Sequence, residues 1–440
     1  ITNLAGITIA DGSGGTASNY TLTGGTHNFT VNRRVVGVSG TRLYDATTNA
    51  VASDLSTHTN LVGTETLNLS GTGTIASKNV GSNKTVSVGT LALADGSNGG
   101  LAANYTLSGG THQLTVNQRP LNATLSRQYD GTTTSAGSDL SSFDALQGGE
   151  TLTLSGSGTS ASANVANGIA MSSNGNLALV DGTGLASNYS LNSTVINITE
   201  RVLNSSGSKI YDANTDALAA DITLSNLVSG EALNHSGTAT ISSANAGSYT
   251  ITNLAGITIA DGSGGTASNY TLTGGTHNFT VNPKVVSIQG NKTYDGNTTI
   301  SSGDITSITD TVGAETLVIS SGSGTVSSAN AATYASAGIN EGTLTLGNGT
   351  NGGLASNYTL TGHAASSFQV AQRVLSSSGS RIYDGSTTAS SSDLTLSNLV
   401  GSETLTLSGN GTLANANVGT NKSVTLNTLS IADNSGLAAN

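Results

Sequence analysis

Cysteine and tryptophan are absent from this 440-residue sequence, which also contains only two prolines and one methionine. Without thiols the chain cannot form disulfide bonds, thiolate metal sites or a cysteine nucleophile. No run of 18 apolar residues occurs, so no segment is expected to span a bilayer as a helix. A thiol-free chain that is rich in Thr, Ser, Asn and Gly and poor in Lys is typical of exported bacterial β-repeat proteins, because oxidation in the periplasm cannot trap it.

Charged residues are also scarce, at 9% of the sequence, and aromatic residues make up 4%. The formal net charge of −11 at pH 7 disfavours nucleic acids and anionic lipid surfaces as partners, because both repel a negative chain. A composition dominated by Gly, Ser, Thr and Asn resembles that of disordered segments. The periodic patterns described next predict a folded chain instead.

The most prominent feature that is present is internal repetition. Residues 1–32 recur without a change at 251–282. A Tyr-Asp-Gly or Tyr-Asp-Ala motif occurs at Tyr44, Tyr129, Tyr211, Tyr294 and Tyr383, at intervals of 85, 82, 83 and 89 residues. A second marker, Asn-Tyr, occurs at Tyr20, Tyr105, Tyr189, Tyr270 and Tyr358. Intervals of this length predict small domains, since the repeat unit of a solenoid is much shorter.

The markers divide the chain into four whole repeats between two partial ones. The predicted boundaries are 34–118 for repeat 1, 119–200 for repeat 2, 201–283 for repeat 3 and 284–372 for repeat 4, with a partial repeat at 1–33 (the N-terminal segment) and another at 373–440 (the C-terminal segment). The next Asn-Tyr tyrosine is due after Asn440, so we expect the sequence to be a window from a longer array. No flexible linker separates the repeats at junctions such as 29–36, which predicts neighbours packed in a fixed orientation.

Apolar and small polar residues alternate over short stretches such as 66–69, 85–88 and 29–31. This period of two is typical of half-buried β-strands, and Gly-rich runs such as 96–100 are typical of turns. We therefore predict an all-β fold of tandem modules of about 85 residues, sandwich-like or grasp-like, with little helix. The alternative is one continuous parallel β-helix, which needs coils of about 20 residues, and the repeats contain no such sub-period.

Most charges recur at fixed places in the repeats. The basic residues ten and two positions before the motif tyrosine are Arg34 and Arg42, Arg119 and Arg127, Arg201 and Lys209, Lys284 and Lys292, and Arg373 and Arg381. The repeated acids form four sets: Asp45, Asp130, Asp212, Asp295 and Asp384; Asp54, Asp139, Asp221, Asp304 and Asp393; Glu65, Glu150, Glu231, Glu315 and Glu403; and Asp11, Asp95, Asp181, Asp261 and Asp433. Charges that every copy carries serve the module, since a catalytic site needs only one copy.

Two interpretations of these acids stay open. In the first, each Asp accepts backbone hydrogen bonds in an Asx turn, and the Glu residues form ion pairs with the basic residues. Arg42 and its counterparts are then expected to lie within reach of a repeated acid, with Glu65 and its counterparts as the leading choice. In the second, the carboxylates bind structural calcium at the module junctions, although the acids are single and well separated, so metal-binding residues stay unassigned. We also expect Tyr44 and its four counterparts to be buried in equivalent places, because aromatic residues are so few.

The sequence contains no recognisable catalytic constellation. His27, His112 and His277 lie in matching Gly-Gly-Thr-His segments without a His-x-x-x-His pair, so we interpret them as strand or turn residues. No Gly-x-Ser-x-Gly elbow with a matched acid and base accompanies the many serines. The glycine-rich stretches at 11–15 and 261–265 lack the Gly-Lys-Ser/Thr ending of a phosphate loop. We predict that the protein is not an enzyme and has no catalytic or cofactor-binding residues.

The motifs together resemble a known family. Along each repeat they are an Arg or Lys ten residues before the tyrosine, Tyr-Asp-Gly/Ala, Gly-x-Glu-Thr-Leu (as at 63–67 and 401–405), Ser-Ala-Asn-Ala-Gly and Ala-Ser-Asn-Tyr. This array resembles the YDG-type repeats, and the related MBG type, of large bacterial surface proteins of the filamentous-haemagglutinin-like, two-partner secretion class. The pattern departs at Ala46 and Ala213, which replace the motif glycine, and at 346–349, where repeat 4 lacks the Asp. The resemblance implies an exported, elongated stalk or adhesive fibre.

From these patterns we expect an extracellular structural rod, stalk or filament of a bacterial adhesin or biofilm-matrix fibre at the cell surface. The alternative is a lectin-like array with one carbohydrate site in each repeat, which requires repeated, exposed aromatic platforms. The expected partners are neighbouring modules, other copies of the chain, and an outer-membrane transporter during export. We expect neither nucleic-acid binding nor membrane insertion of this segment.

Overall fold

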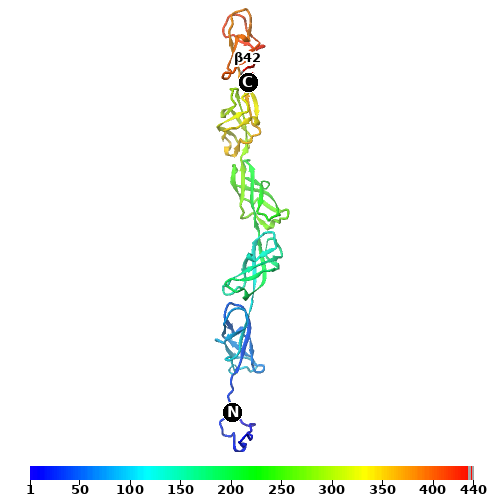
Figure 1. The fold of residues 1–440 in the computed structure, drawn as a ribbon, viewed down its shortest axis with the longest axis vertical. Helices are drawn as coiled ribbons and strands as arrows, with labels where there is room; N and C mark the ends of the chain where they lie inside the picture. Colours follow the sequence, from blue (N-terminus) through cyan, green and yellow to red (C-terminus); the bar gives the residue numbers. More distant parts are fainter. Residues whose placement is uncertain (435–437, 439–440) are drawn as a thin grey trace. The chain divides into compact units, whose positions relative to one another are not determined.

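The computed structural model describes residues 1–434 and 438, and β-strands dominate its regular structure (Figure 1). The helices among these residues are 3₁₀ turns of three residues each. They are η1 (Ala17–Asn19), η2 (Ala52–Asp54), η3 (Ala102–Asn104), η4 (Gly137–Asp139), η5 (Ala186–Asn188), η6 (Ala219–Asp221), η7 (Ala267–Asn269), η8 (Ser302–Asp304), η9 (Ser336–Gly338), η10 (Ala355–Asn357) and η11 (Ser391–Asp393). The prediction of an all-β fold is confirmed. The end of the C-terminal segment, 435–437 and 439–440 with Asn440, lies outside the described residues.

The chain divides into two compact units, Ile1–Arg201 and Val202–Asn440. The strands of repeat 1 are β1 (Arg34–Val35), β2 (Gly37–Leu43), β3 (Asn49–Val51), β4 (Thr57–Thr59), β5 (Leu67–Ser70), β6 (Thr72–Ile75), β7 (Gly81–Ser87), β8 (Ala92–Asp95), β9 (Tyr105–Thr106) and β10 (His112–Asn117). Those of repeat 2 are β11 (Arg119–Gln128), β12 (Thr134–Ala136), β13 (Leu140–Phe143), β14 (Leu152–Ser155), β15 (Ser157–Ser160), β16 (Ala166–Ser173), β17 (Ala178–Asp181) and β18 (Tyr189–Thr199). Repeats 1 and 2 each have a six-stranded sheet, in the order β3-β6-β7-β10-β2-β4 in repeat 1 and β12-β15-β16-β18-β11-β13 in repeat 2.

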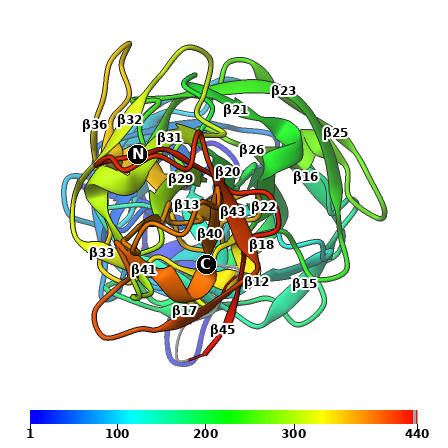
Figure 2. The ribbon, with the colours of Figure 1, turned by 90° about the horizontal axis from the view of Figure 1, so that it is seen from above.

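The strands of repeat 3 are β19 (Arg201–Val202), β20 (Asn204–Ile210), β21 (Asp216–Leu218), β22 (Ile222–Ser225), β23 (Leu233–Ile241), β24 (Gly247–Asn253), β25 (Ile257–Asp261), β26 (Tyr270–Thr271) and β27 (His277–Asn282). In the second unit, the long strand β23 pairs with both β21 and β25, which lie beside it in Figure 2. The strands of repeat 4 are β28 (Lys284–Val285), β29 (Ser287–Thr293), β30 (Thr299–Ser301), β31 (Ile305–Thr309), β32 (Leu317–Ser321), β33 (Ser323–Val326), β34 (Ala332–Ala335), β35 (Ile339–Asn340), β36 (Thr345–Asn348), β37 (Tyr358–Thr359) and β38 (Ser367–Ala371). Those of the C-terminal segment are β39 (Ser376–Gly379), β40 (Thr388–Ser390), β41 (Leu394–Ser397), β42 (Leu405–Ser408), β43 (Asn410–Leu413), β44 (Val424–Thr425) and β45 (Ser430–Asp433).

The first and last long strands of each whole repeat lie side by side and run parallel. These pairs are β2–β10, β11–β18, β20–β27 and β29–β38. Because parallel neighbours point the same way, the chain enters a repeat at one end of its sheet and leaves at the opposite end. The described strands pair only with strands of the same repeat, so the architecture is a series of separate sheets and not a continuous parallel β-helix.

The alternating apolar residues face the core of each sheet, where Leu114 and Phe279 are almost completely buried. The motif tyrosines are buried at Tyr44, Tyr129, Tyr211 and Tyr294, with 0–6% of each residue exposed. Tyr383 is 62% exposed. The prediction of five equivalent buried tyrosines is therefore wrong for Tyr383. Tyr44 is covered by Glu150 and Tyr189 of the following repeat and lies beside a sheet with a parallel strand pair, and the described residues provide neither for Tyr383.

Candidate functional site at the repeat junctions

The Tyr-Asp motif forms a turn that is closed by an ion pair with the basic residue two positions before the tyrosine. The pairs are Arg42–Asp45 at 2.6 Å, Arg127–Asp130, Lys209–Asp212 at 2.8 Å, Lys292–Asp295 at 2.9 Å and Arg381–Asp384 at 3.4 Å. The prediction that these basic residues lie within reach of a repeated acid is confirmed, but the acid is the motif Asp, so the choice of Glu65 as the partner of Arg42 is wrong. The motif Asp lies only three residues along the chain, and it reaches the basic side chain without any help from tertiary structure.

The same Asp accepts a backbone hydrogen bond from the residue two positions later, as the Asx-turn interpretation predicted. Thr47 N donates to Asp45 Oδ1 at 2.9 Å, and Asn297 N donates to Asp295 Oδ1 at 3.1 Å. The residue after the Asp has a positive φ, 78° at Gly131 and 63° at Ala46. Glycine adopts this conformation without strain, which explains the usual Tyr-Asp-Gly sequence. Repeats 1 and 3 have alanine at this place and keep the turn, with φ 63° at Ala46 and 64° at Ala213, so the backbone conformation favours glycine but does not require it.

A second repeated Asp closes the loop before each Asn-Tyr tyrosine. Asp95 Oδ1 accepts from Ala102 N at 2.7 Å, and Asp261 Oδ1 accepts from Ala267 N at 2.7 Å. In repeat 4, which lacks this Asp, Asn348 Oδ1 accepts the corresponding bond from Ala355 N at 2.8 Å. A neutral amide thus does what the carboxylate does elsewhere, which favours a turn-forming role over a calcium ligand at this place.

The Glu of Gly-x-Glu-Thr-Leu is the centre of the junction between consecutive repeats. Glu150 of repeat 2 accepts from Tyr189 of its own repeat at 2.9 Å and from Tyr44 of repeat 1 at 2.6 Å. In the second unit, Glu315 accepts from Tyr358 at 2.5 Å and from Tyr211 of the preceding repeat at 2.7 Å. Each carboxylate therefore joins the two marker tyrosines of neighbouring repeats through charge-assisted hydrogen bonds.

The two tyrosine rings at such a junction also pack against each other edge to face. The ring centroids of Tyr44 and Tyr189 are 5.2 Å apart at an interplanar angle of 78°, and those of Tyr211 and Tyr358 are 5.3 Å apart at 78°. This geometry contributes about 0.5–1.5 kcal/mol beyond the burial of the rings. Tyr44 and Tyr189 belong to one apolar cluster with Leu121 of repeat 2, so the core continues across the junction within the first unit.

An asparagine adds further contacts at the junction inside each unit. Asn188, just before Tyr189, accepts from Val80 N of repeat 1 at 2.9 Å and donates to Asn79 Oδ1 at 3.0 Å. The counterpart in the second unit is Asn357, which accepts from Ala246 N at 2.8 Å and donates to Asn245 Oδ1 at 3.0 Å.

The arginine ten residues before the motif tyrosine bonds to backbone carbonyls on both sides of a junction. Arg119 Nη1 donates to Tyr44 O at 3.3 Å, and Arg119 Nε donates to Ala145 O of its own repeat at 3.2 Å. Arg373 donates in the same way to Tyr294 O at 3.3 Å and to Asn398 O at 2.7 Å. These guanidinium groups therefore tie one repeat to the turn of the repeat before it.

Burial and the shared carboxylate shift the pKa values at the junction. Burial, and then the hydrogen bond to Glu150, raise the pKa of Tyr189 to about 12. Burial and the bond to Glu315 raise the pKa of Tyr211 to about 12 as well. Burial alone raises the pKa of Glu150, but hydrogen bonds from Lys78, Tyr44 and Tyr189 outweigh it and hold that pKa below its usual value. The junction therefore favours a neutral tyrosine pair around a charged glutamate.

Alkaline solution is expected to open these junctions. A tyrosine pKa raised above the unfolded value of about 10 contributes stability that is complete below pH 10 and is lost as the pH rises toward about 12. Absorbance of tyrosinate and circular dichroism, followed together through this range, should show late ionisation accompanied by loss of structure. Tyr189→Phe is the control: it removes one tyrosine with a raised pKa, so the late rise in tyrosinate absorbance should be smaller in this variant. Complete ionisation near pH 10 with the fold intact would contradict the assignment.

The residues of the junction all lie at repeated positions of the sequence, but the contacts between them were not predicted. Tyr44, Glu150 and Tyr189 recur with the same period in the repeats, and this shared period was the only sign in the sequence that they belong to one site.

The repeated histidines are strand residues, as predicted: His112 and His277 are buried, and the ring of each bonds to a turn carbonyl five residues earlier, at 2.8 Å. Among residues 1–434 and 438, no three His, Asp or Glu side chains gather closely enough to hold a metal ion. No helix in the described chain has the length and apolar character needed to cross a membrane.

Chelation of divalent ions is expected to leave the melting temperature unchanged, because the repeated Asp side chains are already engaged by backbone N–H groups and basic side chains. Melting curves recorded with and without a chelator measure this. Asn348→Asp is a matched variant, since it gives repeat 4 the acid of the other repeats and should not create sensitivity to calcium. A clear fall in melting temperature on chelation would identify these acids as metal ligands.

Comparison with known protein families identifies the repeats. The sequence profile of the YDG domain matches residues 30–114, 112–196, 199–278 and 370–440, which is more than half of the chain. Repeat 4, which has Asn348 in place of the loop Asp, is not among the matched ranges. A search of curated protein sequences gave no match.

Proposed function

Because the chain belongs to the YDG domain family and its repeats are joined through a buried Glu–Tyr cluster, we propose that it is a structural repeat array without catalytic activity. In this proposal the array forms part of the rod, stalk or filament of a bacterial surface protein, such as an adhesin or a biofilm-matrix fibre. Its role is to hold other parts of the protein at a distance, and each junction transmits force from one repeat to the next.

The observation that carries this proposal is the parallel pairing of the first and last strands of each repeat. Because the chain enters a repeat at one end of its sheet and leaves at the other, the repeat can act as a spacer. If the chain entered and left at the same end, the repeat would project as a side branch. The connection between β10 and β11 is the single residue Gln118, which leaves almost no freedom for a flexible hinge. The Tyr44–Glu150–Tyr189 contacts then fix the rotation of repeat 2 on repeat 1.

The proposed location is extracellular, at the bacterial surface, within a protein of the filamentous-haemagglutinin-like, two-partner secretion class. The support is the absence of cysteine and the dominance of Gly, Ser, Thr and Asn in the sequence, together with the YDG repeats. An outer-membrane transporter is the proposed partner during export.

The rigidity of one junction tests the proposed function directly. The chain has no cysteine, so Ser87→Cys and Thr153→Cys introduce two unique sites for spin labels on exposed strand residues of repeats 1 and 2. We expect a distance distribution between the labels as narrow as that of a reference pair within repeat 1, Asn49→Cys with Ser87→Cys. A distribution much broader than the reference would mean a flexible tether, and the proposal of a rigid spacer would fail.

A further inference from the structure

The strands by which the chain enters and leaves a repeat are hydrogen-bonded to each other over most of their length. In repeat 2, residues 119–128 of β11 lie opposite residues 189–199 of β18, with one shift of register after Leu121. The pairing ends at the motif tyrosine, where Tyr129 N donates to Thr199 O at 2.9 Å. The corresponding bonds of the other whole repeats, at 2.8–2.9 Å, are Tyr44 N to Asn117 O, Tyr211 N to Asn282 O and Tyr294 N to Ala371 O.

This arrangement determines how the hydrogen bonds respond to tension along the chain. Tension pulls the first strand toward the preceding repeat and the last strand toward the following one. Because the two strands run parallel, the pull is directed along them, so it slides one strand past the other and loads all the bonds of the pair together. Antiparallel first and last strands would have their outer ends at the same edge, and tension would then peel them apart bond by bond.

The pair in repeat 2 lies in the interior of its sheet, where water has little access. Strand β16 flanks β18 on one side, and β13 flanks β11 on the other. On the inward face Ala123, Leu125, Ile196 and Ile198 are each 0–1% exposed. A backbone bond that breaks in such surroundings leaves a donor and an acceptor without water to replace the lost partner. Sliding of the strands is therefore opposed at every bonded position at once.

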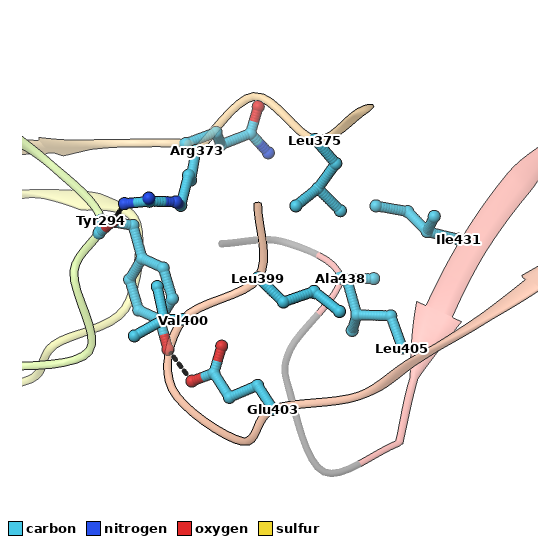
Figure 3. A pocket seen from close by; sticks show the side chains of 10 residues that line it. Tyr294, Arg373, Leu375, Leu399, Val400, Glu403, Leu405, Ile431 and Ala438 are labelled. Carbon is cyan, nitrogen blue, oxygen red and sulfur yellow. Dashed lines mark hydrogen bonds between the residues drawn. The ribbon is translucent and has the colours of Figure 1, made fainter. Parts of the chain in front are cut away.

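An arginine adds one more tie where the chain leaves a repeat. It stands two residues after the last strand and donates to the carbonyl of the motif tyrosine, as Arg119 does to Tyr44 and Arg201 does to Tyr129. In Figure 3 Arg373 bonds to Tyr294 in this way, and the hydroxyl of Tyr294 donates to Glu403. The end of the first strand is thus held by the chain that continues from the last strand.

We propose that the parallel pair of first and last strands is a mechanical clamp, which keeps each whole repeat folded while the array is under tension. The strands between them, β12 to β17 in repeat 2, carry no load until the clamp slips. The inference rests on the proposed function only for the source of the tension, because resistance to force is a property of a single repeat.

The clamp is continuous in repeat 2 and interrupted in repeats 1 and 4. In repeat 1 the parallel pairing covers 34–35 with 105–106 and resumes at 38–43 with 112–117. A turn at 107–111, with Gly109 at a φ of 82°, separates the two parts. In repeat 4 residues 360–366 separate the corresponding parts. Residues 189–199 lack the Gly-Gly pair and form one strand, so we expect repeat 2 to withstand more force than repeat 1.

Single-molecule force spectroscopy of the full 440-residue chain tests the clamp. The chain has no cysteine, so two introduced thiols define the points of attachment. Gln118→Cys with Glu200→Cys loads repeat 2 along its strands, as in an array. Gln118→Cys with Ser187→Cys loads the adjoining ends of β11 and β18, because Gln118 Nε2 donates to Ser187 O at 3.2 Å. All three positions are exposed. We expect the second pair of thiols to unfold repeat 2 at a force lower by a factor of about two or more, since the bonds then break one after another.

The two attachments act on the same repeat, so the comparison separates the direction of loading from the stability of the fold. The gain in length, roughly 250 Å for the chain between residues 118 and 200, identifies the unfolding of repeat 2. Equal forces in the two directions would overturn the proposal, because the parallel pairing would then give no resistance beyond that of the fold.

Arg33→Cys with Gln118→Cys loads repeat 1 along its strands and tests the role of continuity. We expect it to unfold at a lower force than repeat 2 under the same rate of loading. A repeat 1 as strong as repeat 2 would refute the assignment of the resistance to the length of unbroken pairing. A flexible junction in the spin-label experiment would refute the rigid spacer and leave these forces unchanged, so the two proposals fail separately.

Discussion

Replacing Tyr44 by Ala is expected to destabilise repeat 1 by about 3–5 kcal/mol, the range for truncation of a large buried aromatic side chain. The residue is fully buried, packs against the ring of Tyr189 and donates to Glu150. Native-state hydrogen exchange in β2 and β10 measures the effect. Since about 1.4 kcal/mol corresponds to a factor of ten, protection should fall by two to more than three orders of magnitude.

Tyr383→Ala provides the matched control for this prediction. It removes the tyrosine of the same Tyr-Asp motif, but at a position that is 62% exposed. Its effect on stability should lie within about 0.5 kcal/mol, as is usual for surface substitutions. Equal losses at the two positions would mean that the motif acts through its local turn alone, and that burial of the ring contributes little.

Glu150→Ala is expected to uncouple repeat 1 from repeat 2. The substitution leaves the hydroxyls of Tyr44 and Tyr189 without their carboxylate acceptor, at about 1–3 kcal/mol for each buried group. The loss should concentrate at the junction, so hydrogen exchange should rise at Val80, whose N–H donates to Asn188 across it. The spin-label distances between residues 87 and 153 should broaden in the same variant.

Glu65→Ala separates this junction effect from a simple loss of stability in one repeat. Glu65 occupies the same motif position and accepts from Tyr105 of its own repeat. Its removal should weaken repeat 1 near Tyr105 and leave the distances between repeats 1 and 2 narrow. If Glu65→Ala broadened those distances as much as Glu150→Ala, the shared carboxylate would not be what fixes the junction.

Much of the fold was predictable because its signals are local or repeated. The alternation along 85–88 predicted a strand, and that stretch overlaps β7, which ends at Ser87. The Asx turn at Asp45 was predictable because its partner is two residues away. The partner of Glu65 was not predictable in this way, since all four sets of acids repeat with the same period. Repetition identifies residues that serve the module, but many pairings between them fit the same period equally well.

The two copies of the 32-residue sequence separate what the sequence determines from what the tertiary structure decides. Both copies form the same 3₁₀ turn, η1 and η7, and both make the same loop bonds. Asp11 accepts from Ala17 N at 2.6 Å, and the ring of His27 bonds to Leu22 O at 2.8 Å, as at the corresponding positions of the second copy. These contacts close within seven residues, so the sequence alone is sufficient to form them.

The strands and the burial of the aromatic rings, in contrast, depend on tertiary structure. Phe279 is buried because β27 lies between β20 and β24, and β20 begins more than sixty residues earlier in the chain. Phe29 has the same neighbours in sequence and is exposed, because the N-terminal segment has no such sheet among the described residues. A strand cannot satisfy its backbone hydrogen bonds by itself, whereas a turn can. The sequence therefore determines the turns and the face that each strand will bury, and only the tertiary structure supplies the partner that makes the strand.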